Sequence, residues 1–296
     1  MTHRPASLDA LCALVAESAQ QHRALRLVGR GTWLDGGTPV SAVAERVHLD
    51  AFGGVVEYEP GDVTITVGAA LTIAELNAAT AAHNQWCPLA PWGGDDGTVG
   101  ATIATATSGP YAHVLGHPRD LVLGLECVDG TGKVLRPGGK VVKNVAGFDL
   151  VRLMTGSWGT LAAITRVSLR LRALPAADET WIIEAPVDGA AAAEAALRQC
   201  ATPPIACEVI PREAGGDGSA LLVRIAGNAA YIAAARAVVQ SAGSARAASH
   251  EQWTALRLAV RTRSPRRPML DAVRALNERV RRAFDPAGIL NPGIMG

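Results

Sequence analysis

The sequence lacks the cysteine and histidine spacings that metal sites and disulfide frameworks require. Its 296 residues include five cysteines, and none of them forms a CxxC pair or lies near histidines at a zinc-like spacing. An odd, scattered set of this kind is typical of reduced thiols in a cytoplasmic protein. We therefore expect no metal site, and no cysteine spacing here could ligate an iron–sulfur cluster.

Aromatic side chains, net charge and long apolar runs are also scarce. Aromatic residues make up 4% of the chain, so alanine, valine and leucine must form most of the core. The net charge of +1 gives no electrostatic reason to expect nucleic acid, an acidic substrate or an anionic membrane. There is no basic start followed by an apolar run, and no uninterrupted apolar stretch of membrane-spanning length. The sequence thus predicts a cytoplasmic protein without a signal peptide or membrane span.

The pattern of expected elements changes near Pro175. After this point a strand, a helix, two strands and a second helix follow one another, an order that suggests a small ferredoxin-like unit. A basic linker at 261–267 and a last helix at about 269–283 come next. Before Pro175 the clearest expected elements are a helix after Ser7, strands at 24–28, 55–58, 63–67 and 161–171, a helix at 72–83 and a hairpin at 121–136.

Two glycine-rich segments could bring backbone amides close to a phosphate. The first, with Gly29, Gly31 and Thr32, follows a predicted strand. The second runs from 97 to 110 and has almost no bulky side chains, which suits close packing around a large planar ligand. Neither segment has the GxGxxG or GxxxxGK[ST] spacing, which argues against a Rossmann site and against a P-loop. Each segment alone is also explained as a glycine-rich turn between strands.

The order of several short motifs is more informative than any one of them. The motifs lie at 29–31, 88–91, 98–100, 108–110, 119–120, 142–150, 156–161, 164–165 and 284–293. In this order they resemble the FAD-binding domain of the vanillyl-alcohol oxidase and p-cresol methylhydroxylase superfamily. More narrowly, they resemble the small FAD-binding subunit of bacterial glycolate oxidase. The resemblance covers nearly the whole chain, and its most specific parts are residues 143–161 and the terminal motif.

The resemblance implies an α+β fold with a two-subdomain FAD-binding domain of the vanillyl-alcohol oxidase / p-cresol methylhydroxylase type and a short ferredoxin-like cap domain. The FAD-binding domain would span 1–174, with subdomains at about 1–58 and 59–174. The cap domain would span 175–263. The C-terminal helix and tail, 264–296, would pack back on the FAD-binding domain.

The resemblance also implies where FAD would lie. Covalent attachment in this superfamily uses a histidine near the first loop, sometimes with a cysteine. The loop here has Trp33 and no histidine, so we expect noncovalent FAD, with Cys87 as a buried bystander. The implied contacts are Gly29, Gly31 and Thr32 to the phosphates; Thr98, Gly100, Thr102, Ser108 and Gly109 along the ribityl and isoalloxazine region; and Gly159 and Ile164 near the flavin or its adenine end.

Several positions depart from the family pattern or have no assigned role. Arg30 replaces a common third glycine, and it either points outward, the interpretation we favour, or pairs with a phosphate. Ala101 replaces the second glycine of the usual TVGG, and alanines at 162–163 replace glycine and valine. No catalytic residue is assigned. Three residues could act near the flavin but are also explained as solvated side chains: Lys143, His113 and His117.

The implied function is that of one flavin subunit among several. The expected cap is under half the length of the cap in full-length oxidases of this type, and it has few groups to grip a carboxylate. We therefore expect a subunit of a glycolate (2-hydroxy acid) oxidase or dehydrogenase that forms glyoxylate. Its partners would be a larger homologous flavin subunit and an iron–sulfur subunit, which would make any peripheral contact with the inner membrane.

Two alternatives stay open. A structural or assembly subunit would bind FAD weakly or not at all, an interpretation favoured by Arg30 and Ala101. A free-standing FAD-dependent oxidase of another hydroxy acid or alcohol would be active without partners.

Overall fold

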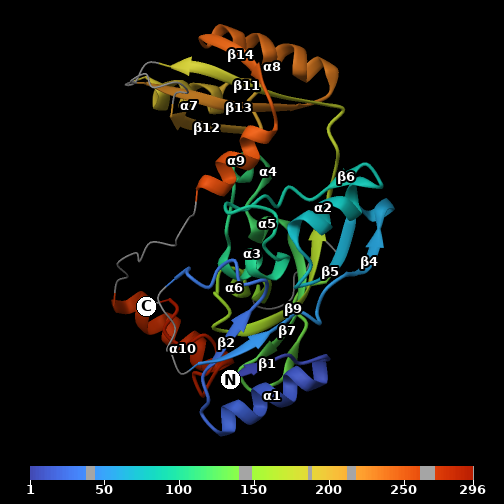
Figure 1. Cartoon of the computed structure of the whole chain (residues 1–296), viewed down its shortest axis with the longest axis vertical. Helices are drawn as coiled ribbons and strands as arrows, with labels where there is room; N and C mark the ends of the chain where they lie inside the picture. The colour runs from blue at the N-terminus through green and yellow to red at the C-terminus, as the bar shows by residue number, and fades with distance from the viewer. Residues whose placement is uncertain (38–43, 140–148, 186–188, 212–217, 261–270, 296) are drawn as a thin grey trace.

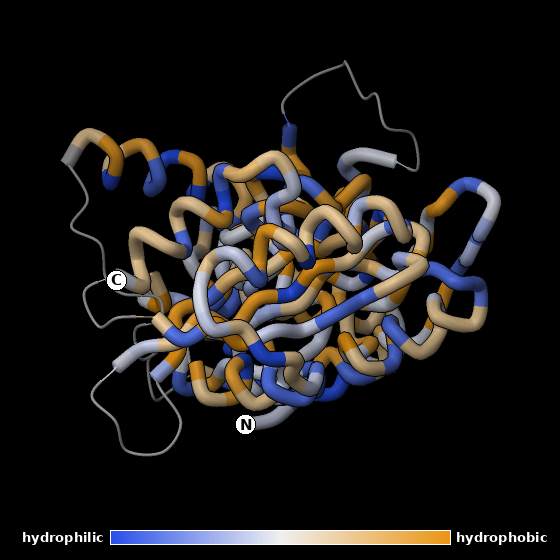
Figure 2. Tube along the Cα trace, turned by 90° about the horizontal axis from the view of Figure 1, so that it is seen from above, coloured by the Kyte–Doolittle hydropathy of each residue, from blue (hydrophilic) through white to orange (hydrophobic). Residues whose placement is uncertain are grey.

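The computed structural model describes residues 1–37, 44–139, 149–185, 189–211, 218–260 and 271–295. Three sheets and their helices make up most of this part of the chain (Figure 1). Seen from above, apolar and hydrophilic residues alternate along most segments (Figure 2), as expected of elements with one face in a core and the other in solvent. Lys143 and the predicted basic linker lie outside the described residues.

The N-terminal sheet is parallel, with strand order β1-β3-β2. Ser7 caps the helix beside it, because its side chain accepts the Ala10 N–H at 3.2 Å. Leu11 and Val15 of this helix are fully buried. The elements are β1 (Thr2–His3), α1 (Leu8–Gln20), β2 (Leu25–Val28) and β3 (Glu45–His48).

The second sheet is antiparallel, with order β4-β5-β9-β7-β8. Its long strands bury valine, leucine and isoleucine against short helices on one side. Thr72 and Glu75 start α2 with a reciprocal capping box, which the sequence pattern allows. The elements are β4 (Val55–Glu59), η1 (Pro60–Asp62), β5 (Thr64–Gly68), α2 (Ile73–Ala81), α3 (Val99–Thr105), α4 (Ala112–Leu115), α5 (Pro118–Leu121), β7 (Val122–Asp129), β8 (Val134–Leu135), α6 (Leu150–Met154) and β9 (Ala162–Arg170), with a separate ribbon of β6 (Gln85–Trp86) and β10 (Arg172–Ala173).

The third sheet has the order β12-β13-β11-β14 and is antiparallel throughout. Together with two helices it forms the ferredoxin-like unit that the sequence predicts, drawn at the top of Figure 1. Helix α9 lies on the opposite face of this sheet, where Trp253 packs near Tyr111, the residue before α4. The elements are β11 (Ala177–Ala185), α7 (Ala190–Gln199), β12 (Ala206–Pro211), β13 (Ser219–Gly227), α8 (Ala229–Ser241), β14 (Ser244–Ala248) and α9 (Glu251–Ala259).

The C-terminal helix α10 (Asp271–Phe284) is followed by a tail that returns to the N-terminal sheet. The Leu25 N–H donates to Ile289 O at 2.7 Å, and the Asn291 N–H donates to Leu25 O at 2.8 Å. The tail thereby continues the hydrogen bonding along the free side of β2. Residues from the two ends of the chain share one hydrophobic core.

The α+β fold with a ferredoxin-like unit is confirmed, but several elements were not expected from the sequence, among them α3, β14 and α9. Residues 97–110 were interpreted as a segment without a helix, with a glycine-rich turn between strands as one explanation, whereas they contain α3. The Thr98 side chain caps this helix by accepting the Ala101 N–H at 3.1 Å. Strand β14 and helix α9 were also missed. Both are short, and β14 is completed by pairing with β11 rather than by a pattern of its own.

Candidate cofactor-binding cleft

A cleft of about 100 Å³ opens where β2 ends. Its walls come from the first glycine loop, the turn at 69–70, the start of α3, the end of the turn before β9, and the C-terminal tail. A second cleft of about 400 Å³ shares residues 31–34 with it and extends toward the loop at 91–97. The predicted residues that line the first cleft are Gly29, Gly31, Thr32, Gly100, Gly159 and Ile164; Gly31, Thr32 and Thr102 line the second.

The first glycine loop offers backbone donors. Gly31 has φ +81°, and a side chain on Gly29 would place its Cβ 2.8 Å from Thr98 Oγ1. Both positions therefore need glycine. Within the described part of the chain, no acceptor receives a hydrogen bond from the amides of residues 29–32. These amides are available to an anion.

The start of α3 is different, because its amides already have partners. The Val99 N–H donates to Leu71 O at 2.9 Å, and the Gly100 N–H donates to Ala69 O at 2.8 Å. A Cβ on Gly100 would lie 2.7 Å from Ala69 Cβ. Glycine is thus required at position 100 by the packed turn, whatever lies in the cleft. Thr98 is buried as the helix cap and lines neither of the two clefts.

Arg26 lines the first cleft, and it was not among the residues predicted from the sequence. Its side chain lies on β2, and the residue is 9% exposed. One guanidinium nitrogen, Nη2, is 3.4 Å from Trp33 O, while Nη1 is buried without a hydrogen-bond partner. Burial, and then the like charge of Arg46, lower the pKa of Arg26. The available signal was a charged residue within a short apolar strand.

Two tryptophans and the C-terminal tail form another wall of the first cleft. The rings of Trp33 and Trp158 meet edge to face, with centroids 5.9 Å apart. Asn291 Nδ2 donates to Trp158 O at 2.7 Å. The predicted terminal motif therefore contributes Asn291 to the cleft itself.

The remaining predicted contacts, Ser108 and Gly109, lie outside both clefts. A Cβ on Gly109 would meet Ala90 O at 1.6 Å, so a close backbone crossing requires this glycine. Ser108 Oγ is 2.8 Å from Nδ1 of His117. Ser108, which was expected near the flavin, thus lies within hydrogen-bond distance of His117, one of the two candidate histidines. The other, His113, is exposed.

Several other residues are placed as the sequence analysis expected or nearly so. Arg30 is exposed, and its charge helps to lower the pKa of Glu75, after the hydrogen bonds from Thr72. Arg119 and Asp120 are 3.8 Å apart in an exposed pair, which is a weak anchor. Cys87 is buried and lines neither cleft.

The residues of the first cleft fit a diphosphate. Free amides on the first loop and an unpartnered, buried guanidinium nitrogen on Arg26 border the same space. Phosphate oxygens accept hydrogen bonds from both kinds of donor. Among the described residues, no cluster of three or more histidine, cysteine or carboxylate side chains could hold a metal ion. No helix in the same ranges has the length and apolar character needed to cross a membrane.

Known proteins with similar sequences bind a ligand of the kind that the cleft fits, a cofactor with a diphosphate. Residues 1–138 match the family described as FAD binding domain. Over 142 residues the chain is 37% identical to glycolate oxidase subunit GlcE of Escherichia coli, covering 48% of this chain and 40% of that protein. It is 31% identical to D-lactate dehydrogenase of Archaeoglobus fulgidus over 57% of this chain and 38% of the relative, and 31% identical to glycolate oxidase subunit GlcD of Bacillus subtilis over 52% and 33%.

These matches span about two fifths or less of the curated relatives' length. A structure of alkyldihydroxyacetonephosphate synthase has the same fold, with a TM-score of 0.70 at 18% identity over 87% of this chain and 54% of that chain. Residues 1–138 are therefore similar to an FAD binding domain, and the chain has the fold of this synthase.

Proposed function

We propose that this chain is an FAD-binding subunit of a glycolate or other 2-hydroxy-acid oxidase. The observation that carries the proposal is the cleft, with free loop amides beside Arg26. Over 142 residues the chain is also 37% identical to a glycolate oxidase subunit. Its partners would be a larger homologous flavin subunit and an iron–sulfur subunit. On this proposal the protein works in the cytoplasm and reaches the inner membrane only through those partners.

The residues of this chain would hold and orient the cofactor. The amides of residues 29–32 and the Arg26 guanidinium would bind the diphosphate, and the wall with Trp158 and Asn291 would enclose one end. The chemistry that FAD supplies when bound is removal of a hydride from the carbon that bears the substrate's hydroxyl group. In this proposal Ser108, within the second glycine-rich segment, and its neighbour His117 are part of the flavin region.

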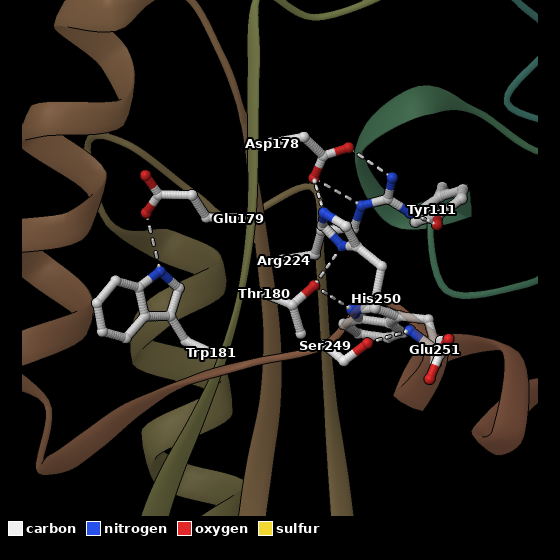
Figure 3. A network of polar contacts seen from close by, with 10 residues as sticks. Tyr111, Asp178, Glu179, Thr180, Trp181, Arg224, Ser249, His250 and Glu251 are labelled. Carbon is white, nitrogen blue, oxygen red and sulfur yellow. Dashed lines mark hydrogen bonds and ion pairs between the residues drawn. The ribbon is translucent and has the colours of Figure 1, made fainter.

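The cap sheet supports the view that substrate binding needs another subunit. Arg224 on β13 is a cation on the face that meets α4, and Figure 3 shows it between Asp178 and Tyr111. Its Nε donates to Asp178 Oδ1 at 2.9 Å, and Nη1 donates to the Tyr111 hydroxyl. Burial lowers the pKa of Arg224 to about 10, so the guanidinium keeps its charge at neutral pH.

With these contacts Arg224 holds the cap domain against the segment that contains Tyr111. A 2-hydroxy acid requires a cation for its carboxylate and a base within reach of its hydroxyl group. Arg212, another arginine of the cap sequence, lies outside the described residues. We infer that a partner subunit completes the substrate site.

The test compares the purified chain alone with the chain co-expressed with its flavin and iron–sulfur partners. FAD content is measured by absorbance, and turnover by dye reduction with glycolate and with D-lactate. We expect bound FAD and little turnover from the single chain, with turnover restored in the complex. Robust turnover from the single chain would favour a free-standing oxidase. A chain that never acquires FAD, even in the complex, would favour an assembly subunit.

A further inference from the structure

Arg26 has donor capacity that the described protein leaves unused. It lies on β2 directly before the first glycine loop, is 9% exposed, and lines the same cleft as residues 29–32. Its Nη1 has no hydrogen-bond partner, and Nη2 makes one long contact with Trp33 O. In the described ranges no carboxylate forms an ion pair with it, although many other arginines of the chain have one.

The neighbourhood of Arg26 disfavours a cation unless an anion joins it. The β2–β3 register places Arg26 directly opposite Arg46, a residue of the same charge. Removing a guanidinium from water without an opposite charge destabilises a folded protein. The fall in the pKa of Arg26 has the same two causes, burial first and Arg46 second.

We propose that Arg26 is the charged residue that binds the diphosphate of FAD, acting together with the backbone amides of residues 29–32. The inference rests on the proposed FAD-binding function, which it makes specific to one side chain. The planar guanidinium can donate two parallel hydrogen bonds to phosphate oxygens, and the loop amides add further donors. The anion would supply the counter-charge that the described residues do not provide.

This role predicts opposite effects on stability and on binding. Replacing Arg26 by methionine keeps an unbranched side chain of similar reach but removes the charge. The cofactor-free Arg26→Met protein should melt at the same temperature as the wild type or higher, because an uncompensated buried cation is lost. Its FAD affinity should fall about ten- to hundredfold, since a hydrogen bond to a charged group is lost at the diphosphate.

The experiment measures the melting temperature of FAD-free protein and the FAD dissociation constant for wild type, Arg26→Met and Arg26→Lys. The matched control is Arg46→Met, which removes an exposed arginine from the neighbouring strand at the same register. We expect Arg46→Met to bind FAD within threefold of wild type and Arg26→Lys to recover part of the loss. Added salt should weaken FAD binding to wild type more than to Arg26→Met.

Inorganic pyrophosphate is a second probe, independent of the flavin. It should raise the melting temperature of FAD-free wild type and not that of Arg26→Met. If wild type responds to pyrophosphate through Arg26 but does not bind FAD, the FAD proposal fails and the anion site stands. If wild type responds to neither probe, both fail. If Arg26→Met lowers the melting temperature by several degrees and still binds FAD within threefold of wild type, Arg26 is structural and the inference is overturned.

Discussion

Oδ1 of Asn291 accepts a hydrogen bond from the Leu27 N–H at 2.8 Å, across 264 residues of chain. The same side chain donates through Nδ2 to Trp158 O. One buried amide thus joins the tail, β2 and the turn before β9, which are three walls of the first cleft. Asn291 has φ +43°, in the left-handed region that asparagine tolerates better than most residues.

Asn291→Ala should destabilise the protein and weaken FAD binding together. The substitution leaves the Leu27 N–H and Trp158 O without their partners and places alanine in a left-handed conformation. We expect a loss of about 2–4 kcal/mol in the free energy of unfolding. The loss is measured by denaturant unfolding of the cofactor-free protein. The control is Asn77→Ala, at a partly exposed position of α2. If the Asn291→Ala protein is as stable as this control, the hydrogen bonds of Asn291 to Leu27 and Trp158 do not stabilise the fold.

Gly100→Ala should lower stability even without cofactor. The added Cβ would lie 2.7 Å from Ala69 Cβ and 2.9 Å from Ala69 O, so the turn or the helix must move. We expect a loss of about 1–3 kcal/mol, the range typical of overpacking. Gly61→Ala is the control, because no heavy atom lies within 4 Å of a Cβ built there. Should Gly100→Ala and Gly61→Ala melt alike while only the former loses FAD, the glycine serves the flavin rather than the turn.

FAD should leave the protein on denaturation. The described part of the first loop offers Trp33 and no histidine, cysteine or tyrosine that could form a bond to the flavin. After acid precipitation the yellow colour is expected in the supernatant, measured by absorbance and by mass spectrometry of the pellet. Flavin fluorescence on the denatured protein band would contradict noncovalent binding.

Three thiols should be inert in the native protein at pH 8. Burial raises the pKa of Cys87, Cys127 and Cys207 to about 12, so only about 10⁻⁴ of each is thiolate at that pH. Cys12 and Cys200 are partly exposed and should react, Cys12 more slowly because burial raises its pKa as well. Titration with a disulfide reagent, with and without guanidinium chloride, counts the two classes. Rapid reaction of all five thiols in the native protein would show that the core opens.

Arg257→Met should loosen the cap. Arg257 on α9 donates from Nε to Pro91 O at 3.0 Å and from Nη2 to Asp95 Oδ1 at 2.6 Å. These bonds hold the cap against the loop that lines the second cleft. Because Asp95 is partly exposed, we expect a modest loss of about 1–3 kcal/mol, together with faster proteolysis near the cap. Arg282→Met, at an exposed pair on α10, should leave both measurements unchanged.

Much of the local structure follows from short-range patterns in the sequence. The helix after Ser7, the helix at 72–83 and the strands at 55–58 and 63–67 were predicted and are present. Such features depend on contacts between residues a few positions apart, which a sequence pattern records directly. The order of motifs also identified the fold and the cofactor.

Other features were decided by tertiary structure alone. The sequence shows that position 100 is glycine, but only the turn at Ala69 shows which atoms a side chain would meet. Arg26 is an ordinary charged residue until the loop and Trp33 cover it and leave Nη1 without an acceptor. Asn291 becomes a wall of the cleft only because the tail returns to β2. Burial and pairing at these positions arise between segments far apart in the chain, and no local pattern encodes them.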